Sequence, residues 1–194
     1  RPETMCGQTN CWILPEGEYG ALAKSEREVY ICAARAARNM GFQDVFGKFG
    51  SPECLLTIKG KDLLGCAVKA PLTKYDKIYM LPLTTISMTK GTAIVTSVPS
   101  DSPDDYAAFM DLKNAKKREF YGVQAEWVEP FELISILETP DLGPMAAEYV
   151  CKEMKISSQK DVEKLKEAHD RVYTAGFYKG VMTAGPFKGM TVQQ

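Results

Sequence analysis

The sequence predicts a mixed α/β fold in which a β-barrel or a strongly bent sheet carries helices on its outer side. Several short segments rich in Val, Ile, Leu and Thr, separated by Gly and Pro, have the composition of strands. A few other segments have the charge and apolar spacing of helices. No repeat, low-complexity tract or long linker divides the 194 residues. One domain over residues 1–194 is therefore expected.

Six segments are typical of strands, because β-branched and aromatic residues are frequent in them and Gly or Pro lies near most of their ends. They are residues 7–14, 54–60, 63–72, 77–88, 91–98 and 126–139. Trp12 and Trp127 fall within these segments. We expect both indole rings in the core rather than as stacking surfaces for bases.

Three segments are predicted to be helices from their apolar periodicity. Residues 25–40 begin with a Ser N-cap and are followed by Gly41, a residue typical of the position just past a helix. Residues 144–155 and 158–174 have the pattern of two amphipathic helices, and the second is predicted to end at Gly176.

Charge and cysteine content exclude several function classes. The 24 basic and 25 acidic residues nearly balance, so no overall positive field would hold a nucleic-acid backbone, and any RNA would be gripped locally. Six cysteines without a CxxC pair, and His169 as the one histidine, predict no metal site and a reducing, cytoplasmic compartment. No apolar run approaches the roughly 20 residues that span a bilayer, so no membrane partner is expected.

The most specific local feature is the junction between the predicted strand 91–98 and a helix that begins at Ser102. Asp104 and Asp105 lie in the first turn of this helix. Backbone N–H groups at a helix N-terminus hold anionic or hydroxyl-rich ligands, and a neighbouring carboxylate can hold an ammonium group. Alternatively, Ser102 only caps the helix while the two aspartates complement its dipole, for about 0.3–1 kcal/mol each. The pattern alone leaves both interpretations open.

A second feature is the polar turn from Arg1 to Thr4, which precedes an apolar strand. Arg offers a bidentate hydrogen-bonding fork, and Thr offers a β-branched wall with a hydroxyl group. Ordinary turn chemistry explains these residue types equally well.

Three stretches resemble one family. RPETMCGQTNCW is similar to the threonine-rich motif of the editing (connective polypeptide) domain of cytosolic, eukaryotic-type leucyl-tRNA synthetases. KGTAIVTSVPSDSPDDYAA resembles the second motif of that domain, and AGFYKGVMTAGPFKG resembles the stretch that returns toward the synthetase body. The resemblance implies a single editing domain over 1–194, cut from a longer synthetase. It also implies the editing-domain fold of class I synthetases, with a central β-barrel of about six strands flanked by helices.

The implied function is post-transfer editing, which hydrolyses the ester bond of tRNA(Leu) mischarged with isoleucine, methionine or norvaline-like residues and excludes leucine. The implied partners are the 3′-terminal adenosine of tRNA(Leu) with its amino acid and the remainder of the synthetase. The domain itself is expected to be monomeric and to need no cofactor, since ATP and Mg serve the parent enzyme.

The resemblance also assigns roles to individual residues. Thr4 corresponds to the threonine that walls the pocket against leucine, Arg1 to the arginine that helps place the tRNA end, and Asp105 to the aspartate that binds the α-ammonium group. Further positions that match the pocket are Met88, Thr89 and Lys90, beside the terminal adenosine, and Gly91, Thr92, Thr96 and Val98, along the strand. Ala93 departs from the family, which has glycine there.

Two alternatives remain. The chain could be a free-standing hydrolase of another ester, or a non-catalytic tRNA-binding or interaction module derived from an editing domain. The basic residues Lys113, Lys116, Lys117 and Arg118 are either a solvated helix face or a contact for the tRNA acceptor arm. His169 is expected on a helix surface, far along the chain from both motifs.

Overall fold

The computed structural model describes residues 1–194 and divides them into two compact units. Unit 1 comprises Arg1–Asn10, Ala67–Tyr79 and Thr96–Gln194, and unit 2 comprises Cys11–Cys66 and Met80–Val95. Each unit is therefore built from segments that are distant in the sequence. The expectation of a single editing domain over 1–194 stays a prediction.

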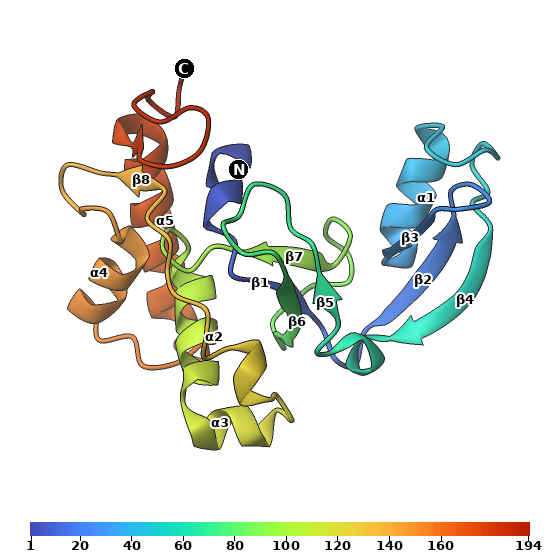
Figure 1. Cartoon of the computed structure of the whole chain (residues 1–194), viewed down its shortest axis with the longest axis horizontal. Coiled ribbons are helices and arrows are strands. Elements are labelled where there is room, and N and C mark those ends of the chain that lie inside the picture. The colour runs from blue at the N-terminus through green and yellow to red at the C-terminus, as the bar shows by residue number, and fades with distance from the viewer. The chain divides into compact units, whose positions relative to one another are not determined.

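The strands form three open sheets, with the orders β5-β6-β1-β7, β3-β2-β4 and β8-β9 (Figure 1). Their bounds are β1 Asn10–Ile13, β2 Glu18–Ala23, β3 Val29–Cys32, β4 Cys54–Lys59, β5 Ala67–Val68, β6 Ile78–Pro82, β7 Ile94–Ser97, β8 Leu137–Glu138 and β9 Val181–Met182. The predicted central barrel of about six strands is wrong, because closure requires the two edge strands of one tilted sheet to pair with each other. Here the edges of the four-stranded sheet are β5, which has only two residues, and β7.

The helices are α1 Ala34–Phe42, α2 Pro103–Lys113, α3 Ala115–Phe120, α4 Ala146–Glu153 and α5 Val162–Lys179. Short 3₁₀ helices are η1 Pro2–Gly7, η2 Gly60–Leu63 and η3 Ala125–Trp127. None of the helices is both long enough and apolar enough to cross a bilayer.

Unit 2 contains the antiparallel sheet β3-β2-β4 with α1 beside it (Figure 1). Their shared core consists of Leu22, Cys32, Ala36, Ala37 and Phe46. The predicted helix over 25–40 is correct only in its second half, because Val29–Cys32 forms β3 instead. A tight hairpin, in which Lys24 N donates to Glu28 O at 2.9 Å, brings these β-branched and aromatic residues against β2. The composition did not reveal β2, whose Gly and Ala residues weaken its strand signal.

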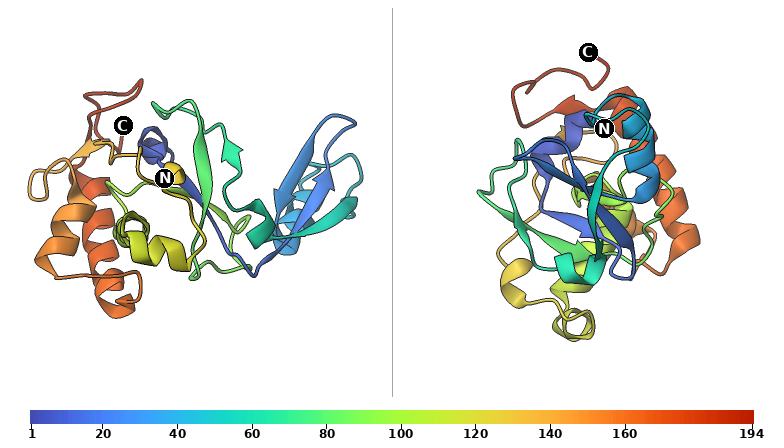
Figure 2. Two further views of the ribbon diagram at one scale, coloured as in Figure 1. Left: turned by 60° about the horizontal axis from the view of Figure 1, so that its bottom comes forward. Right: turned by 90° about the vertical axis from the view of Figure 1, so that its right-hand side faces the viewer.

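Unit 1 contains the helices of the second half of the chain. Figure 2 shows α4 and α5 side by side, and their common core consists of Leu142, Ala146, Val150, Ala168 and Val172. The helix predicted over 144–155 is confirmed by α4. The next helix continues to Lys179 instead of ending at Gly176, which lies buried within α5. Gly is unfavourable in a helix, so an interior position indicates a need for space there.

The segment 126–139 is mostly irregular, and only β8 at its end confirms the predicted strand. Around residues 129–132, side chains rather than a neighbouring strand bond to its backbone. Lys113 Nζ donates to Glu129 O at 2.9 Å and to Phe131 O at 2.6 Å, while the Tyr75 hydroxyl accepts from Glu132 N at 2.8 Å. A strand pattern without a paired strand therefore forms an extended loop.

The two tryptophans and most of the basic residues at 113–118 make contacts with other residues of the chain. Trp12 is fully buried, as predicted, while Trp127 is half-buried and stacks on Tyr79 with ring centroids 6.2 Å apart. In the basic run, Lys117 pairs with Asp111 at 2.5 Å, and Arg118 pairs with Glu129 at 2.7 Å. Lys113 also has a partner within the chain, because its Nζ donates to Glu129 O.

Candidate functional site

The two motifs meet in unit 1, although about a hundred residues separate them in the chain. The Arg1 guanidinium forms an ion pair with Asp101, and Thr9 N donates to Ser97 O at 3.2 Å. At Gly7 the backbone of the first motif lies close to the second motif, because a Cβ built there would be only 2.8 Å from Val98 Cγ1. A side chain at this position would thus separate η1 from the end of β7.

Thr4 lies buried within η1. Its Oγ1 donates to Arg1 O at 2.8 Å, and its backbone N–H donates to the same oxygen at 3.1 Å. Both bonds close the turn around Pro2, so the position of the Thr4 side chain is determined by the local backbone. A side chain held in this way suits a role that depends on shape.

Asp105 is the third residue of α2, and its carboxylate is directed back toward the end of β7. Its Oδ2 accepts from Val98 N at 2.9 Å in a buried environment. The Ser102 hydroxyl caps the helix by accepting from Asp105 N at 3.3 Å, as the sequence predicts. A buried carboxylate is therefore held where the strand ends and the helix begins, beside the positive end of the helix dipole.

Asp101 is a buried acidic residue whose importance the sequence did not reveal. Burial raises the pKa of its carboxyl group from 3.8 to about 6, although the Arg1 guanidinium beside it acts in the opposite direction. Glu3 also pairs with Arg1, at 2.9 Å from its Nε. The Arg1 guanidinium thus forms ion pairs with two carboxyl groups of unit 1, those of Asp101 and Glu3.

Helix α5 completes this region. The Arg1 guanidinium lies over the Tyr173 ring, 4.4 Å from its centroid. His169 is a partly exposed helix residue, as predicted, and its Nδ1 lies 3.1 Å from Asp104 Oδ2. Asp104 therefore has a partner in addition to the helix dipole. No local signal in the sequence marks Tyr173, because its role depends on which element α5 packs against.

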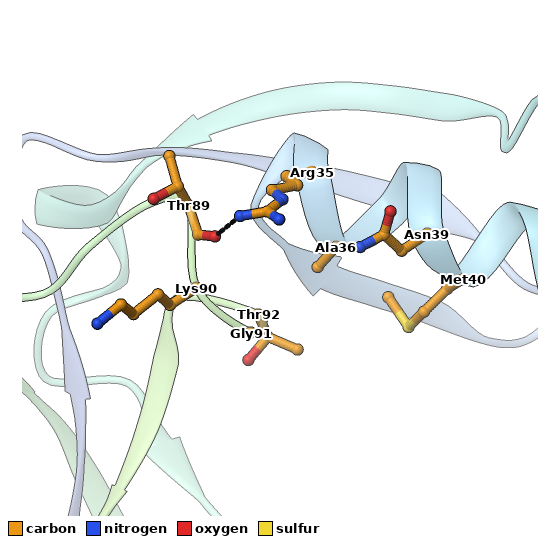
Figure 3. Close-up of a pocket in the computed structure, with 8 residues that line it drawn as sticks. All are labelled: Arg35, Ala36, Asn39, Met40, Thr89, Lys90, Gly91 and Thr92. Carbon is orange, nitrogen blue, oxygen red and sulfur yellow. Dashed lines mark hydrogen bonds between the residues drawn. The ribbon is translucent and has the colours of Figure 1, made fainter.

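The predicted residues Met88–Thr92 form a second group, which lies in unit 2, whereas Thr96 and Val98 belong to unit 1. The loop before β7 and one side of α1 line a pocket of about 460 Å³ (Figure 3), formed by Arg35, Ala36, Asn39, Met40, Thr89, Lys90, Gly91 and Thr92. The Arg35 guanidinium donates to Thr89 O, and Ala33 N donates to Thr92 O at 2.9 Å, which ties the loop to α1. Met88 precedes this loop and does not line the pocket. Arg35 and Asn39 were not predicted.

The strand after this loop is shorter than predicted, because two residues before it have left-handed backbone. Gly91 has φ +52° and Ala93 has φ +59°. An L-residue in this conformation costs about 1–2 kcal/mol, which explains why glycine suits the position of Ala93. Thr96 is exposed on β7, whereas Val98 is buried in a core cluster with Cys6, Ile136, Leu137 and Met182. The strand predicted over 91–98 is therefore confirmed only for Ile94–Ser97, and Thr92 and Val98 lie outside it.

Comparison with known proteins gives consistent results. No family model matches the chain. It is 49% identical over 195 residues to the cytoplasmic leucine–tRNA ligase of Arabidopsis thaliana and 46% identical to that of Dictyostelium discoideum. Among solved structures, it is 46% identical to GlLeuRS-CP1, with a TM-score of 0.93 and coverage of 100% of this chain and 70% of that one. It is 30% identical to the cytosolic leucyl-tRNA synthetase editing domain of P. knowlesi, with a TM-score of 0.85 and coverage of 99% and 74%.

The chain belongs to the editing-domain family of leucyl-tRNA synthetases. The family resemblance and the mixed α/β fold predicted from the sequence are thus confirmed. The chain spans 18% of the length of the Arabidopsis and Dictyostelium ligases. Both are named cytoplasmic, in agreement with the predicted compartment of this editing domain.

Proposed function

We propose that this editing domain acts after transfer, as an aminoacyl-tRNA hydrolase that removes isoleucine, methionine or norvaline-like residues from tRNA(Leu). The observation that supports the proposal most directly is the meeting of the two motifs in unit 1, where Arg1 pairs with Asp101 and Asp105 binds Val98 N. A second selection step is useful because a hydrophobic pocket separates side chains differing by one methylene by only about 1–3 kcal/mol.

In this proposal Asp105 anchors the α-ammonium group of the attached amino acid. Its buried carboxylate is oriented by the Val98 N–H and lies at the N-terminus of α2. Hydrogen bonds between an ammonium group and a carboxylate are roughly twice as strong as neutral ones. The anchor would hold the scissile ester at a defined distance from the Thr4 wall, which excludes leucine.

Hydrolysis of the ester needs an aimed water molecule and stabilisation of the developing oxyanion. We propose that Thr4 and the backbone around Asp105 orient the carbonyl group, while the free vicinal hydroxyl of the ribose orients the water. Much of the rate enhancement would then come from positioning. Arg1 would help to place the tRNA end.

The resemblance of the sequence supports a role for Met88, Thr89 and Lys90 beside the terminal adenosine. Within unit 2, Thr89 and Lys90 line the pocket described above, and Arg35 holds their loop from the side of α1. The partners proposed for the chain are the 3′ end of tRNA(Leu) and the remainder of the synthetase. No cofactor is proposed for this domain, since ATP and Mg would act in the parent enzyme.

The decisive experiment replaces Asp105 in the full-length enzyme and measures deacylation of isoleucyl-tRNA(Leu). Asp105→Ala is expected to abolish deacylation while leucine charging is retained. Asp104→Ala is the matched control, because Asp104 lies in the same helical turn but is exposed. Unchanged deacylation by Asp105→Ala would refute the assignment and favour a non-catalytic tRNA-binding module.

The steric role of Thr4 has its own test. Thr4→Ala should allow hydrolysis of correctly charged leucyl-tRNA(Leu), because it removes both substituents of Cβ. Thr4→Val keeps the branched shape but loses the bond from Oγ1 to Arg1 O, so leucine should remain protected. If leucyl-tRNA(Leu) stays intact with Thr4→Ala, this residue is not the wall.

A further inference from the structure

One face of α5 touches both motifs of the candidate site. His169, Tyr173 and Gly176 are spaced by four and three residues and therefore lie on the same face of the helix. His169 bonds to Asp104 of the second motif, and Tyr173 lies under the Arg1 guanidinium of the first motif. The rings of His169 and Tyr173 are themselves in contact, with centroids 3.7 Å apart. No role was predicted for this helix.

Gly176 provides the space in which Arg1 lies. A Cβ at this position would be 3.2 Å from Arg1 Nη2 and 3.7 Å from Asp101 Oδ1. The absence of a side chain thus allows the ion pair between Arg1 and Asp101 to lie directly against the helix. This explains why a residue that disfavours helices occurs in the interior of α5.

Tyr173 limits the conformations that the Arg1 side chain can adopt. An arginine side chain has many rotamers, and ordering it costs up to about 2 kcal/mol of conformational entropy. The aromatic ring, 4.4 Å from the guanidinium carbon, stabilises the one arrangement in which Arg1 also reaches Asp101. Burial raises the pKa of the Tyr173 hydroxyl, while the Ser102 hydroxyl at the cap of α2 acts in the opposite direction.

We propose that Tyr173 is a positioning residue for editing, which holds Arg1 in the arrangement that receives the aminoacylated tRNA end. The proposal rests on the function proposed above. In this proposal the ring of Tyr173 acts through Arg1 and not by contact with the substrate. Helix α5 is then a wall of the site as well as part of the core.

The first test compares Tyr173→Leu with Tyr173→Phe in the full-length enzyme. The Leu variant removes the aromatic face and should lower kcat for deacylation of isoleucyl-tRNA(Leu) roughly tenfold, with little change in KM. The Phe variant keeps this face and should retain most of the activity. Tyr178→Leu is the control, because Tyr178 lies on the same helix with its side chain exposed. Equal losses in the Leu and Phe variants, or wild-type kcat in Tyr173→Leu, would overturn the proposal.

A double-mutant cycle tests whether Tyr173 acts through Arg1. If it does, Tyr173→Leu should have little further effect in an Arg1→Ala background, so that the double variant resembles Arg1→Ala within about twofold. A purely structural role for Tyr173 predicts independent effects that multiply. Multiplicative losses would contradict the proposed mechanism even if each single variant is impaired.

A measurement that needs no activity separates this proposal from the proposed function. The Arg1 charge lowers the pKa of Asp101, so displacement of Arg1 should raise the pKa of this carboxyl group. Titration of the Asp101 ¹³Cγ resonance should show this rise in Tyr173→Leu and in Arg1→Ala, but not in Tyr178→Leu. An unchanged Asp101 titration in Tyr173→Leu would refute positioning of Arg1. A wild-type protein that does not deacylate, with the titration changed as expected, would refute only the editing function.

Discussion

The hydrogen bond from Val98 N to Asp105 Oδ2 makes a quantitative prediction about the junction between β7 and α2. The bond is 2.9 Å long and buried, and its acceptor is a carboxyl oxygen. Removal of such an acceptor leaves a buried N–H without its partner, at a cost of about 1–3 kcal/mol. Asp105→Ala should therefore destabilise the junction by about this amount. Asp105→Asn keeps an oxygen that can accept the bond and should cost less, about 0.3–1 kcal/mol for the lost charge near the helix N-terminus.

Native-state hydrogen exchange of the Val98 amide measures this effect directly. For Asp105→Ala, the exchange rate should rise about fivefold to a hundredfold, because about 1.4 kcal/mol corresponds to a factor of about ten. For Asp105→Asn the rise should stay below about fivefold, although deacylation should be lost because the ammonium anchor has no charge. If Val98 exchanges equally slowly in the wild type and in Asp105→Ala, the bond does not stabilise the junction and the reasoning fails.

Three further predictions concern packing, backbone conformation and pH. Gly7→Ala should lower the free energy of unfolding of the chain by about 1–3 kcal/mol, because the new Cβ would lie 2.8 Å from Val98 Cγ1 and 2.9 Å from Ile136 Cγ2; a urea midpoint equal to that of the wild type would contradict the close approach. Ala93→Gly should stabilise the chain by up to about 1 kcal/mol, since φ +59° is strained for alanine, and an unchanged or lower melting temperature would argue against this strain. The raised pKa of Asp101, about 6 against 3.8 when unfolded, contributes stability that is present below pH 3.8 and is lost as the pH rises through about 6. Between pH 4 and pH 7, the free energy of unfolding of the wild type should thus fall by about 2–3 kcal/mol relative to that of Asp101→Asn. If the free energies of unfolding of the two proteins change in parallel with pH, the raised pKa of Asp101 is refuted.

Features that depend on a few neighbouring residues were predicted well from the sequence. The Ser102 cap and the acidic first turn of α2 need only the residues of that turn, and α4 follows from the apolar spacing within its own segment. Predictions failed where a distant partner decides the structure. The segment 126–139 has a strand composition but lacks a long partner strand, and the first half of 25–40 pairs with β2 instead of forming a helix.

The candidate site divides in the same way. The sequence by itself determined the family, the presence of Thr4 and Asp105 in their motifs, and the chemistry that each side chain offers. Only the tertiary structure decided that Arg1 pairs with Asp101, that Asp105 binds Val98 N, and that Tyr173 lies beneath the Arg1 guanidinium. The reason is physical: a cap or a turn is encoded by interactions over three or four residues, whereas ion pairs and ring contacts depend on how separate elements pack.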